Sequence, residues 1–407
     1  LDGPFQMQIS SLDYSSYVGI IGIGRIQRGL IKKNASVVVV DGEHQRRGRI
    51  LQVQSFLGLE RIDVDEASAG DIVSISGIDN LQISETLCEP DAPDALPPLS
   101  VDEPTVTMTF QVNKSPFSGR DGKYLTSRQI RERLMLEQTH NVALQVEDTE
   151  DPDQFKVSGR GELHLSVLIE TMRREGYELG VSRPQVIQKE IDGELCEPFE
   201  FTTIEVEEAH QGAIMEMMGE RKAELKNIES DGKGRIRLEY VVATRGLIGF
   251  QTDFLTKTSG SGLISHIFDH YAPIQAGVSS SRKNGVLISN VTGKVLGFAL
   301  FNLQERGRLF ASHGDEVYEG SIVGIHSRGN DLVVNPTKGK QLTNIRAAGT
   351  DENIVLVPPI IMSLEQALEF IEDDELVEIT PNQIRLRKKL LTENERKRAS
   401  RADKVDA

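Results

Sequence analysis

The sequence is poor in several residue types that mark particular classes of protein. Cysteine occurs only at Cys88 and Cys196, which excludes a disulfide framework or a cysteine-rich metal site and fits a reducing compartment. Aromatic residues make up 5% of the chain and tryptophan is absent, which disfavours binding of unpaired nucleobases by stacking. The longest apolar runs, such as SVVVVDG and ENIVLVPPIIM, are of strand length and far short of the roughly 20 residues that span a bilayer.

Loops that cradle nucleotide phosphates are also missing from the sequence. The loop of nucleoside triphosphatases needs a glycine, four further residues and then Gly-Lys-Ser/Thr. The Gly-Lys pairs of this chain begin at Gly122, Gly232, Gly293 and Gly339, and they are followed by Tyr, Gly, Val and Gln. The pattern therefore predicts no loop of this kind in the sequence.

The stretch SGRGELHL, residues 158–165, resembles at first a phosphate loop or a catalytic Glu/His pair. The dinucleotide version of such a loop needs a third glycine, and His164 stands in its place. A helix that begins near Gly161 would point Glu162 and His164 away from each other, because residues two apart do not share a helix face. Apolar residues then follow at helical spacing: Leu165, Leu168, Ile169, Met172. We interpret the stretch as the tight turn by which a strand enters a helix that ends at Gly176.

Charge is distributed unevenly along the chain, whose formal net charge is −16. Residues 60–103 hold twelve acidic residues and one basic residue, and residues 351–384 hold nine acidic and no basic residues. Residues 276–350 carry nine Lys/Arg against five Asp/Glu, and residues 385–404 carry nine against three. Such segregation creates a local positive field that the charge of the whole chain hides. The C-terminal third is therefore a candidate for binding a polyanion, although solvated basic faces explain the surplus equally well.

Strand and turn patterns divide the sequence into four parts, and we predict a multidomain α+β protein. Residues 1–95 read as short, glycine-punctuated strands, typical of a small closed β-barrel, and a proline-rich linker follows. Residues 100–190 alternate as strand, helix, strand, strand, helix, strand, and residues 195–275 repeat this order, which indicates two ferredoxin-like βαββαβ domains. Residues 276–407 predict a β-rich C-terminal domain with short helices and a basic tail.

Local signals place individual helices inside these domains. Thr126 with Gln129, and Thr392 with Glu395, have the spacing of capping boxes at the starts of two helices. In the second ferredoxin-like domain we predict helices in HQGAIMEMMGERKAEL and LIGFQTDFLTKTSG, each followed by a strand.

Residues 326–352 form the segment best suited to a partner. Between Asn335 and Arg346 there are few strongly apolar residues, and glycine and proline interrupt the chain, which predicts an exposed loop. Its polar and basic side chains suit contacts with phosphate and sugar, and the scarcity of aromatic residues favours a structured RNA read by shape and backbone. The candidate RNA-binding residues are Lys338, Lys340, Arg346, Arg328, Arg282, Lys283, Arg306 and Arg308.

We predict no catalytic, cofactor-binding or metal-binding residue in the chain. HIFDH places His266 and His270 four apart, as in half of a zinc site, but no third ligand is apparent and the segment reads as a strand. The competing hypothesis is a self-contained metal-dependent hydrolase built on these histidines, or an activity built on Glu162 and His164.

Longer motifs resemble translational GTPases. SGRGELHLSVLIETMRREGYEL is similar to their third domain, and GRIQRGLIKKN followed by AGDIVSISG is similar to their second-domain β-barrel. The order of a barrel and two ferredoxin-like units resembles elongation factor G and LepA, without the fourth domain between those units. NGVLISN, FALFNLQERGRLF, VYEGSIVGIHSRGNDL and GKQLTNIRAAGTDE resemble the C-terminal domain peculiar to the BipA (TypA) family.

The resemblance implies the cytoplasmic, monomeric, ribosome-binding portion of a GTPase that docks in the factor site of the 70S ribosome or the 50S subunit. It implies rRNA, A-site tRNA and ribosomal proteins as partners, no membrane, and roles in large-subunit assembly and in translation under stress or at low temperature. GTP and Mg²⁺ are expected only in a GTP-binding domain that would precede Leu1 and act with this chain, which by itself should not hydrolyse GTP. The corresponding part of a LepA-like GTPase is the alternative within this resemblance.

Overall fold

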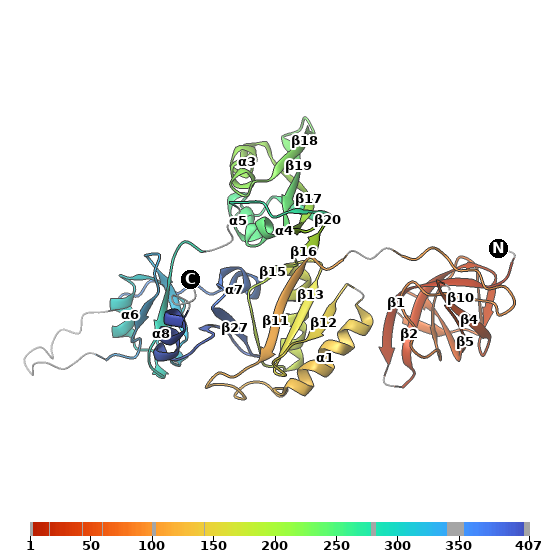
Figure 1. Cartoon of the computed structure of the whole chain (residues 1–407), viewed down its shortest axis with the longest axis horizontal. Coiled ribbons are helices and arrows are strands. Elements are labelled where there is room, and N and C mark those ends of the chain that lie inside the picture. Colours follow the sequence, from red (N-terminus) through yellow and green to blue (C-terminus); the bar gives the residue numbers. More distant parts are fainter. Residues whose placement is uncertain are drawn as a thin grey trace, which may run out of the picture. The chain divides into compact units, whose positions relative to one another are not determined.

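The computed structural model confirms the predicted α+β class (Figure 1). The structure describes residues 3–15, 17–42, 44–58, 60–99, 103–141, 143–277, 282–339 and 354–402. The chain forms two compact units, one of Leu1–Asp102 with Glu132–Gln145 and one of Glu103–Arg131 with Val146–Ala407. Within the described ranges, no helix combines the length and the apolar character that a membrane span requires.

Strands β1 to β10 belong to the first unit. Its eight-stranded sheet has the order β5 (His44–Arg49), β4 (Ser36–Asp41), β10 (Thr86–Cys88), β1 (Gln6–Ser15), β2 (Gly19–Arg28), β9 (Ile72–Ser76), β6 (Gln52–Leu57) and β7 (Glu60–Asp63). A separate pair joins β3 (Leu30–Lys32) to β8 (Glu66–Ser68). Because alternate strand residues point to one face, apolar side chains from β1, β4, β6 and β9 meet in one core that includes Met7, Val39, Val53 and Ile75.

The eight-stranded sheet curls around this core, but the predicted closed barrel is not reached by a continuous ladder. Among the described residues, β5 and β7 at the two ends of the sheet do not pair with each other. The curl is drawn together where β5 runs into β6: Ile50 donates its N–H to the Ala35 carbonyl at 2.9 Å, and Leu51 donates to the Ser76 carbonyl at 2.8 Å. Ala35 directly precedes β4 and Ser76 belongs to β9, and these two strands lie on either side of β1 in the sheet order. The two hydrogen bonds therefore draw distant parts of the sheet together.

The segment from residue 106 to residue 186 has the predicted alternation of strands and helices. Its elements are β11 (Val106–Val112), α1 (Ser127–His140), β12 (Gln145–Asp148), β13 (Gln154–Gly159), α2 (Glu162–Glu175), β14 (Leu179–Val181) and β15 (Gln185–Val186). The predicted capping box of α1 is confirmed, since Thr126 N donates to Gln129 Oε1 at 3.1 Å and Gln129 N donates to Thr126 Oγ1 at 3.4 Å.

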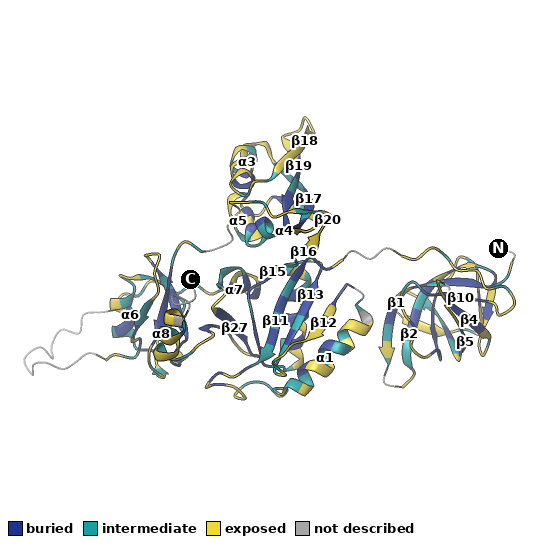
Figure 2. Cartoon of the chain, viewed as in Figure 1, coloured by how far each residue is buried: buried dark blue, intermediate teal, exposed yellow. Residues whose placement is uncertain are grey.

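Two strands from the far end of the chain, β27 (Glu375–Ile379) and β28 (Ile384–Lys388), extend the sheet of this segment. The strand order is β12-β13-β11-β14-β27-β28, with β15 beside β11. β14 and β27 are antiparallel, with Leu179 opposite Ile379 and Val181 opposite Val377. All five residues of β27 are buried (Figure 2). The sheet therefore crosses the boundary predicted at residue 276, which no sequence pattern indicated.

The second ferredoxin-like segment contains one strand that the sequence pattern missed. Its elements are β16 (Lys189–Ile191), β17 (Glu194–Glu207), α3 (Gln211–Glu220), β18 (Glu224–Ser230), β19 (Arg235–Ala243), α4 (Thr244–Leu247), α5 (Phe250–Lys257) and β20 (Leu263–Pro273), with a 3₁₀ turn at Glu208–His210. The helix predicted through Leu225 ends at Glu220, where Lys222 takes a positive φ of 60°. β18 is an edge strand with almost every side chain exposed, so it lacks the alternation that marks a strand.

In its described residues, the C-terminal segment has a small sheet of four short strands and three helices. The sheet order is β23 (Gly307–Leu309), β25 (Ile322–His326), β21 (Val286–Ser289) and β26 (Leu332–Val334), and β22 (Gly293–Lys294) pairs with β24 (Glu316–Val317). The helices are α6 (Gly297–Leu303), α7 (Leu364–Phe370) and α8 (Glu393–Ala402). The predicted box at α8 is confirmed, because Thr392 and Glu395 each accept the other's backbone N–H.

Carboxylates without exposed surface lie where β27 joins the sheet. Glu178, Glu375 and Glu378 are all 0% exposed. Glu178 accepts backbone N–H groups of the loop before α1, from Gly119 at 2.8 Å and from Gly122 at 2.7 Å. These bonds compensate for the desolvation of a buried negative charge, which is costly without partners.

Glu378 is satisfied entirely by side chains from three separate parts of the second unit. It accepts hydrogen bonds from Asn113 at 3.1 Å, Ser115 at 2.9 Å and Arg385 at 3.1 Å, and from the hydroxyl of Tyr318. Burial and the charge of Glu378 raise the pKa of that hydroxyl, so it stays a donor.

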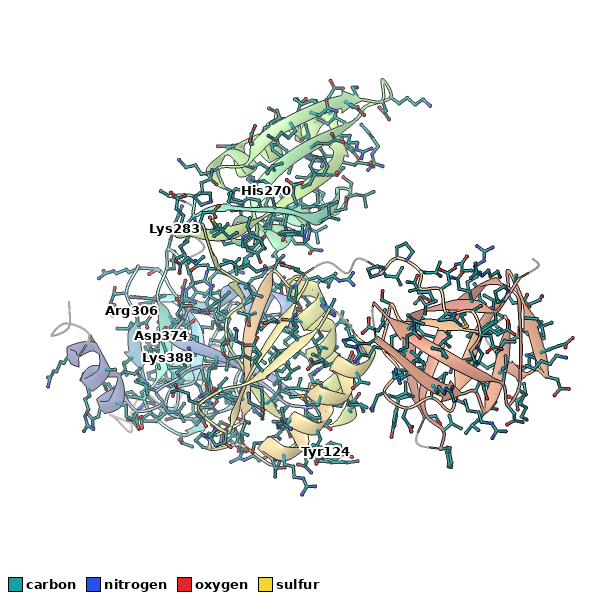
Figure 3. All side chains as sticks on the ribbon, turned by 45° about the vertical axis from the view of Figure 1, so that its right-hand side comes forward. Tyr124, His270, Lys283, Arg306, Asp374 and Lys388 are labelled. Atoms are coloured by element: carbon teal, nitrogen blue, oxygen red, sulfur yellow. The ribbon has the colours of Figure 1, made fainter. Side chains whose placement is uncertain are left out.

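Glu375 forms the centre of a buried ion-pair cluster. Arg282 Nη2 and Lys388 Nζ each lie 2.9 Å from its carboxylate, and Lys388 also contacts Asp331 at 2.7 Å and Asp374 at 2.8 Å (Figure 3). Burial acts to raise the pKa of Glu375, but the hydrogen bond from Arg282 and the charge of Lys388 outweigh it and leave this pKa below its ordinary value. Glu375 is therefore held ionised, and its ion pair with Arg282 connects β27 to the chain just before β21.

We expect Glu375→Gln to lower the free energy of unfolding of the 407-residue chain by about 3–5 kcal/mol, because it leaves Arg282 and Lys388 buried with too little negative charge. Urea unfolding followed by circular dichroism measures the change. Glu316→Gln is the matched control: its ion pair with Arg120 is half exposed and should contribute less than about 1 kcal/mol. Equal small effects of both substitutions would contradict the structural role of Glu375.

The glycine-rich stretch has the structural role that the sequence analysis gave it. Gly161 is the N-cap of α2, and Gly176 ends the helix in the left-handed conformation at φ 101°, donating to the carbonyls of Arg173 and Met172. Glu162 occupies the first turn with Oε1 buried and without a hydrogen-bond partner. Burial, with the charges of Glu369 and Glu365 nearby, raises the pKa of Glu162 to about 8.

We expect stability to fall as the pH rises from 6 to 9. The folded state holds the Glu162 proton more tightly than the unfolded chain, so the resulting stability is complete below pH 4.5 and is lost as the pH passes about 8. Glu162→Gln should raise the free energy of unfolding at pH 9 by about 1–3 kcal/mol relative to the unsubstituted chain and flatten the pH profile. Glu150→Gln, a surface control, should leave the profile unchanged; an unchanged profile in Glu162→Gln would refute the assignment.

Candidate nucleic-acid interface

Three basic residues that lie far apart in the sequence come together at one end of the four-stranded sheet of the C-terminal segment. Lys283 precedes β21, Arg306 precedes β23 and Arg328 follows β25. Because β25 is antiparallel to both β21 and β23, the starts of those two strands lie at the same sheet end as the finish of β25. Arg308 follows two residues after Arg306, within β23.

Backbone hydrogen bonds hold these segments against one another. Gly285 N donates to the carbonyl of Arg328 at 2.8 Å, and Ser327 N donates to the carbonyl of Arg306 at 2.9 Å. A Cβ on Gly285 would lie 2.2 Å from the carbonyl of Asn330, so only glycine permits this approach. The positions of the three basic residues are therefore set by main chain, while their side chains extend from it.

The side chains at this end are free to meet an anion. Lys283, Arg306, Arg308 and Arg328 are exposed, and within the described ranges none of them forms an ion pair with a carboxylate. Lys283 and Arg306 can be located in Figure 3. Elsewhere in this unit arginines such as Arg120 and Arg131 are paired with surface carboxylates. We call Lys283, Arg306, Arg308 and Arg328 the basic end of the sheet.

Arg282, the neighbour of Lys283, is placed differently from the other predicted residues. Its guanidinium contacts Glu375, donates to the carbonyl of Phe370 at 2.8 Å, and lies 4.3 Å from the centre of the Phe370 ring. Its side chain is only 14% exposed, and its contacts hold it against β27 and α7. Periodicity cannot reveal such a difference between adjacent arginines, because it depends on residues about 90 positions away.

Lys338 lies at the opposite end of the same sheet from the basic end. It follows β26, which runs parallel to β21, and it is exposed. The chain around it is anchored, since Leu296 N donates to the carbonyl of Pro336 at 3.0 Å. That contact brings the exposed Lys294 of β22 into the same part of the segment, a residue that the sequence analysis did not select. Lys340 and Arg346 lie outside the described residues.

The histidines of the two alternative catalytic sites have other partners in the structure. His266 and His270 lie on β20, where Nδ1 of His266 contacts Glu200 and Nδ1 of His270 lies 2.7 Å from Asp269. Among the residues that the structure describes, no three His, Cys, Asp or Glu side chains are grouped to hold a metal ion. His164 accepts the N–H of Arg160 at 3.3 Å across the turn into α2.

Three family models match successive segments of the chain. Elongation factor Tu domain 2 matches residues 19–88, Elongation factor G C-terminus matches residues 194–282, and TypA/BipA C-terminal domain matches residues 284–393. The proteins called "Large ribosomal subunit assembly factor BipA" from Escherichia coli (strain K12) and Haemophilus influenzae are each 63% identical to the chain, over 407 and 402 residues. The protein of that name from Buchnera aphidicola is 57% identical over 405 residues.

The alignments cover 100%, 98% and 99% of this chain, and 67%, 65% and 67% of those three relatives, so the chain spans about two thirds of their length. Matched domains of elongation factors Tu and G define the class, a protein built from the domains of translational GTPases. More particularly, the chain belongs to the TypA/BipA family.

We expect Gly285→Ala to lower the free energy of unfolding by about 1–3 kcal/mol, because the added methyl group overlaps the Asn330 main chain and separates Lys283 from Arg328. Thermal unfolding by differential scanning calorimetry measures the loss. Gly212→Ala is the matched control, since an added Cβ there meets nothing within 4 Å. If the two substitutions have equal effects, the close approach at Gly285 is not what fixes the basic end.

Proposed function

We propose that the chain is the ribosome-docking and RNA-contacting portion of a BipA-type translational GTPase that acts in assembly of the large ribosomal subunit. In this proposal its partners are the ribosome or its 50S subunit, rRNA, A-site tRNA and ribosomal proteins, with a contribution to translation under stress or at low temperature. The relatives' printed name, large ribosomal subunit assembly factor, supports this role.

The observation that carries the proposal is the basic end of the sheet. Lys283, Arg306 and Arg328 are gathered there by main-chain contacts, exposed, and unpaired with carboxylates of the described residues. In a chain of net charge −16, cations that are positioned and left without counter-charges favour an external polyanion such as RNA. Arg306 and Arg328 lie in the segment matched by the TypA/BipA C-terminal domain, and Lys283 directly precedes that segment.

GTP and Mg²⁺ have no place in this part of the proposal. The sequence contains no Gly-Lys-Ser/Thr loop to hold a triphosphate. We propose that nucleotide binding belongs to a GTP-binding domain of the whole protein, and that the present chain acts with that domain as a monomer on the ribosome.

The test is binding of the 407-residue chain to 50S subunits and 70S ribosomes by co-sedimentation across a salt series. Neutralising Lys283, Arg306 and Arg328 to Gln should weaken binding at least about tenfold and reduce the slope of log K against log salt by roughly 2 to 3, since each phosphate contact releases counterions. Thermal stability should not change, because none of the three side chains is paired with a carboxylate of the described residues.

Two further variants locate the contact. The double substitution Lys338→Ala and Lys340→Ala probes the opposite end of the sheet together with Lys340, which lies outside the described residues. Weakened binding would extend the contact to Lys338 and Lys340. A control of equal charge change replaces the exposed residues Lys226, Lys233 and Lys257 by Gln. If this control weakens binding as much as the triple variant does, binding follows total charge and the proposed interface is wrong.

A further inference from the structure

A pocket of about 460 Å³, which shares no residue with the basic end, lies in the second unit on one face of the sheet that β27 and β28 extend. Its lining residues are Gln111, Val112, Lys114, Asp153, Gln154, Leu376, Arg387, Lys389, Leu390, Leu391, Thr392 and Glu395. Gln111 of β11 pairs with Gln154 of β13, and Leu376 of β27 pairs with Arg387 of β28, so side chains from these two strand pairs line one pocket. The chain between β28 and α8 forms its wall.

Arg387 is the unusual group in this pocket. Within the described ranges, the cations of the core are Arg183, Arg387 and Lys388, with 6%, 3% and 3% of their surface exposed. Arg183 lies 2.9 Å from Glu372, and Lys388 contacts three carboxylates, whereas Arg387 is paired with none of the described carboxylates. Its Nε is buried without a hydrogen-bond partner. A buried charge without a counter-charge is destabilising unless a partner arrives from outside.

The carboxylates around Arg387 are already engaged. The charge of Arg387 acts on Tyr318, whose hydroxyl donates to Glu378. Glu378 itself already accepts hydrogen bonds from Asn113, Ser115 and Arg385 as well. The pocket's own acidic groups are also occupied.

Asp153 is 2.8 Å from Lys114, and Glu395 accepts the Thr392 hydroxyl at 2.7 Å. The exposed Lys389 has no ion pair within the described part of the chain. The hydrogen bond from Thr392 leaves the charge of Glu395 in place, so Lys389 and Arg387 together give the lining a net positive charge of one.

The remaining lining determines what kind of anion fits. A dianion matches Arg387 and Lys389 better than a single carboxylate does, and arginine binds phosphate oxygens with two parallel hydrogen bonds. Val112, Leu376, Leu390 and Leu391 supply apolar surface beside these charges. The volume exceeds that of a bare phosphate ion and falls within the range of small-molecule pockets.

We propose that this pocket binds a phosphate monoester, with the phosphate on Arg387 and Lys389 and a partly apolar body over the leucines. Such a group is available either as a free nucleotide or as the 5′-phosphate end of an RNA. The site is separate from the basic end, and it holds whether or not the basic end contacts the ribosome.

The test is thermal shift and isothermal titration of the 407-residue chain with inorganic phosphate, AMP, and one short RNA carrying either a 5′-phosphate or a 5′-hydroxyl. Potassium chloride at matched ionic strength is the baseline. Phosphate and AMP should raise Tm and compete with each other, because a ligand that binds only the folded state stabilises it. Binding of AMP identifies a free nucleotide, and preference for the 5′-phosphorylated RNA identifies an RNA end; if no phosphate-bearing probe binds, the proposal is overturned.

Two pocket variants and one control complete the experiment. Lys389→Gln, an exposed change, should weaken AMP binding about tenfold through loss of one charge-assisted contact. Arg387→Gln should abolish the phosphate-induced rise in Tm without lowering Tm in chloride alone, because the lost charge had no partner among the described residues. Arg401→Gln, an exposed arginine of α8 outside the pocket, should bind AMP like the unsubstituted chain. Equal affinity in Lys389→Gln and the unsubstituted chain would also overturn the proposal.

Discussion

The second unit depends on the pairing of β14 with β27 and on the buried charges that accompany it. Adding strands from residues 375–388 to a sheet begun at residue 106 brings carboxylates into the interior, where each needs compensation. Glu178 obtains it from loop amides, and Glu375 obtains it from Arg282 and Lys388. Specific partners on distant segments make this register much more favourable than a slipped one, since a shift would leave charges buried alone.

This arrangement explains why one basic residue is buried in ion pairs while the residue next to it is not. Arg282 and Lys283 are adjacent, yet Arg282 turns to Glu375 while Lys283 remains at the exposed end of the C-terminal sheet. In β28, Lys388 contacts three acidic side chains, whereas Arg387, pointing to the other face of the strand, lines a pocket and forms no ion pair with a described carboxylate. Charge in this unit is thus divided between cations that hold the fold and cations that remain available.

Membership of the TypA/BipA family gives these available cations a context. The basic end of the sheet is proposed to meet RNA, and the Arg387 pocket is proposed to receive a phosphate monoester. The two sites differ physically: the cations of the first are exposed and screened by salt, whereas the second is a pocket whose lining includes a buried guanidinium. Substitutions at one should therefore leave binding at the other intact.

Local features of the fold followed from the sequence because short-range physics controls them. The capping boxes at Thr126 and Thr392, the turn at Gly161 and the end of α2 at Gly176 each depend on residues within a few positions of one another. The α+β class followed from the same periodicities, and the basic character of residues 276–350 was visible as a count. The edge strand β18 escaped because an exposed strand has no apolar alternation to reveal it.

Only the tertiary structure decided which charges pair and which remain free. Chain segments tens to hundreds of residues apart decide that Arg282 contacts Glu375 and that the main chain beside Lys283 bonds to Arg328. They also decide that the buried Nε of Arg387 has no hydrogen-bond partner. The sequence determined that positive charge is concentrated near the C-terminus. Long-range strand pairing decides which of these positive charges stabilise the fold and which remain free to bind a ligand. The physical reason is that a buried charge is stable only where the fold or a ligand supplies the opposite charge.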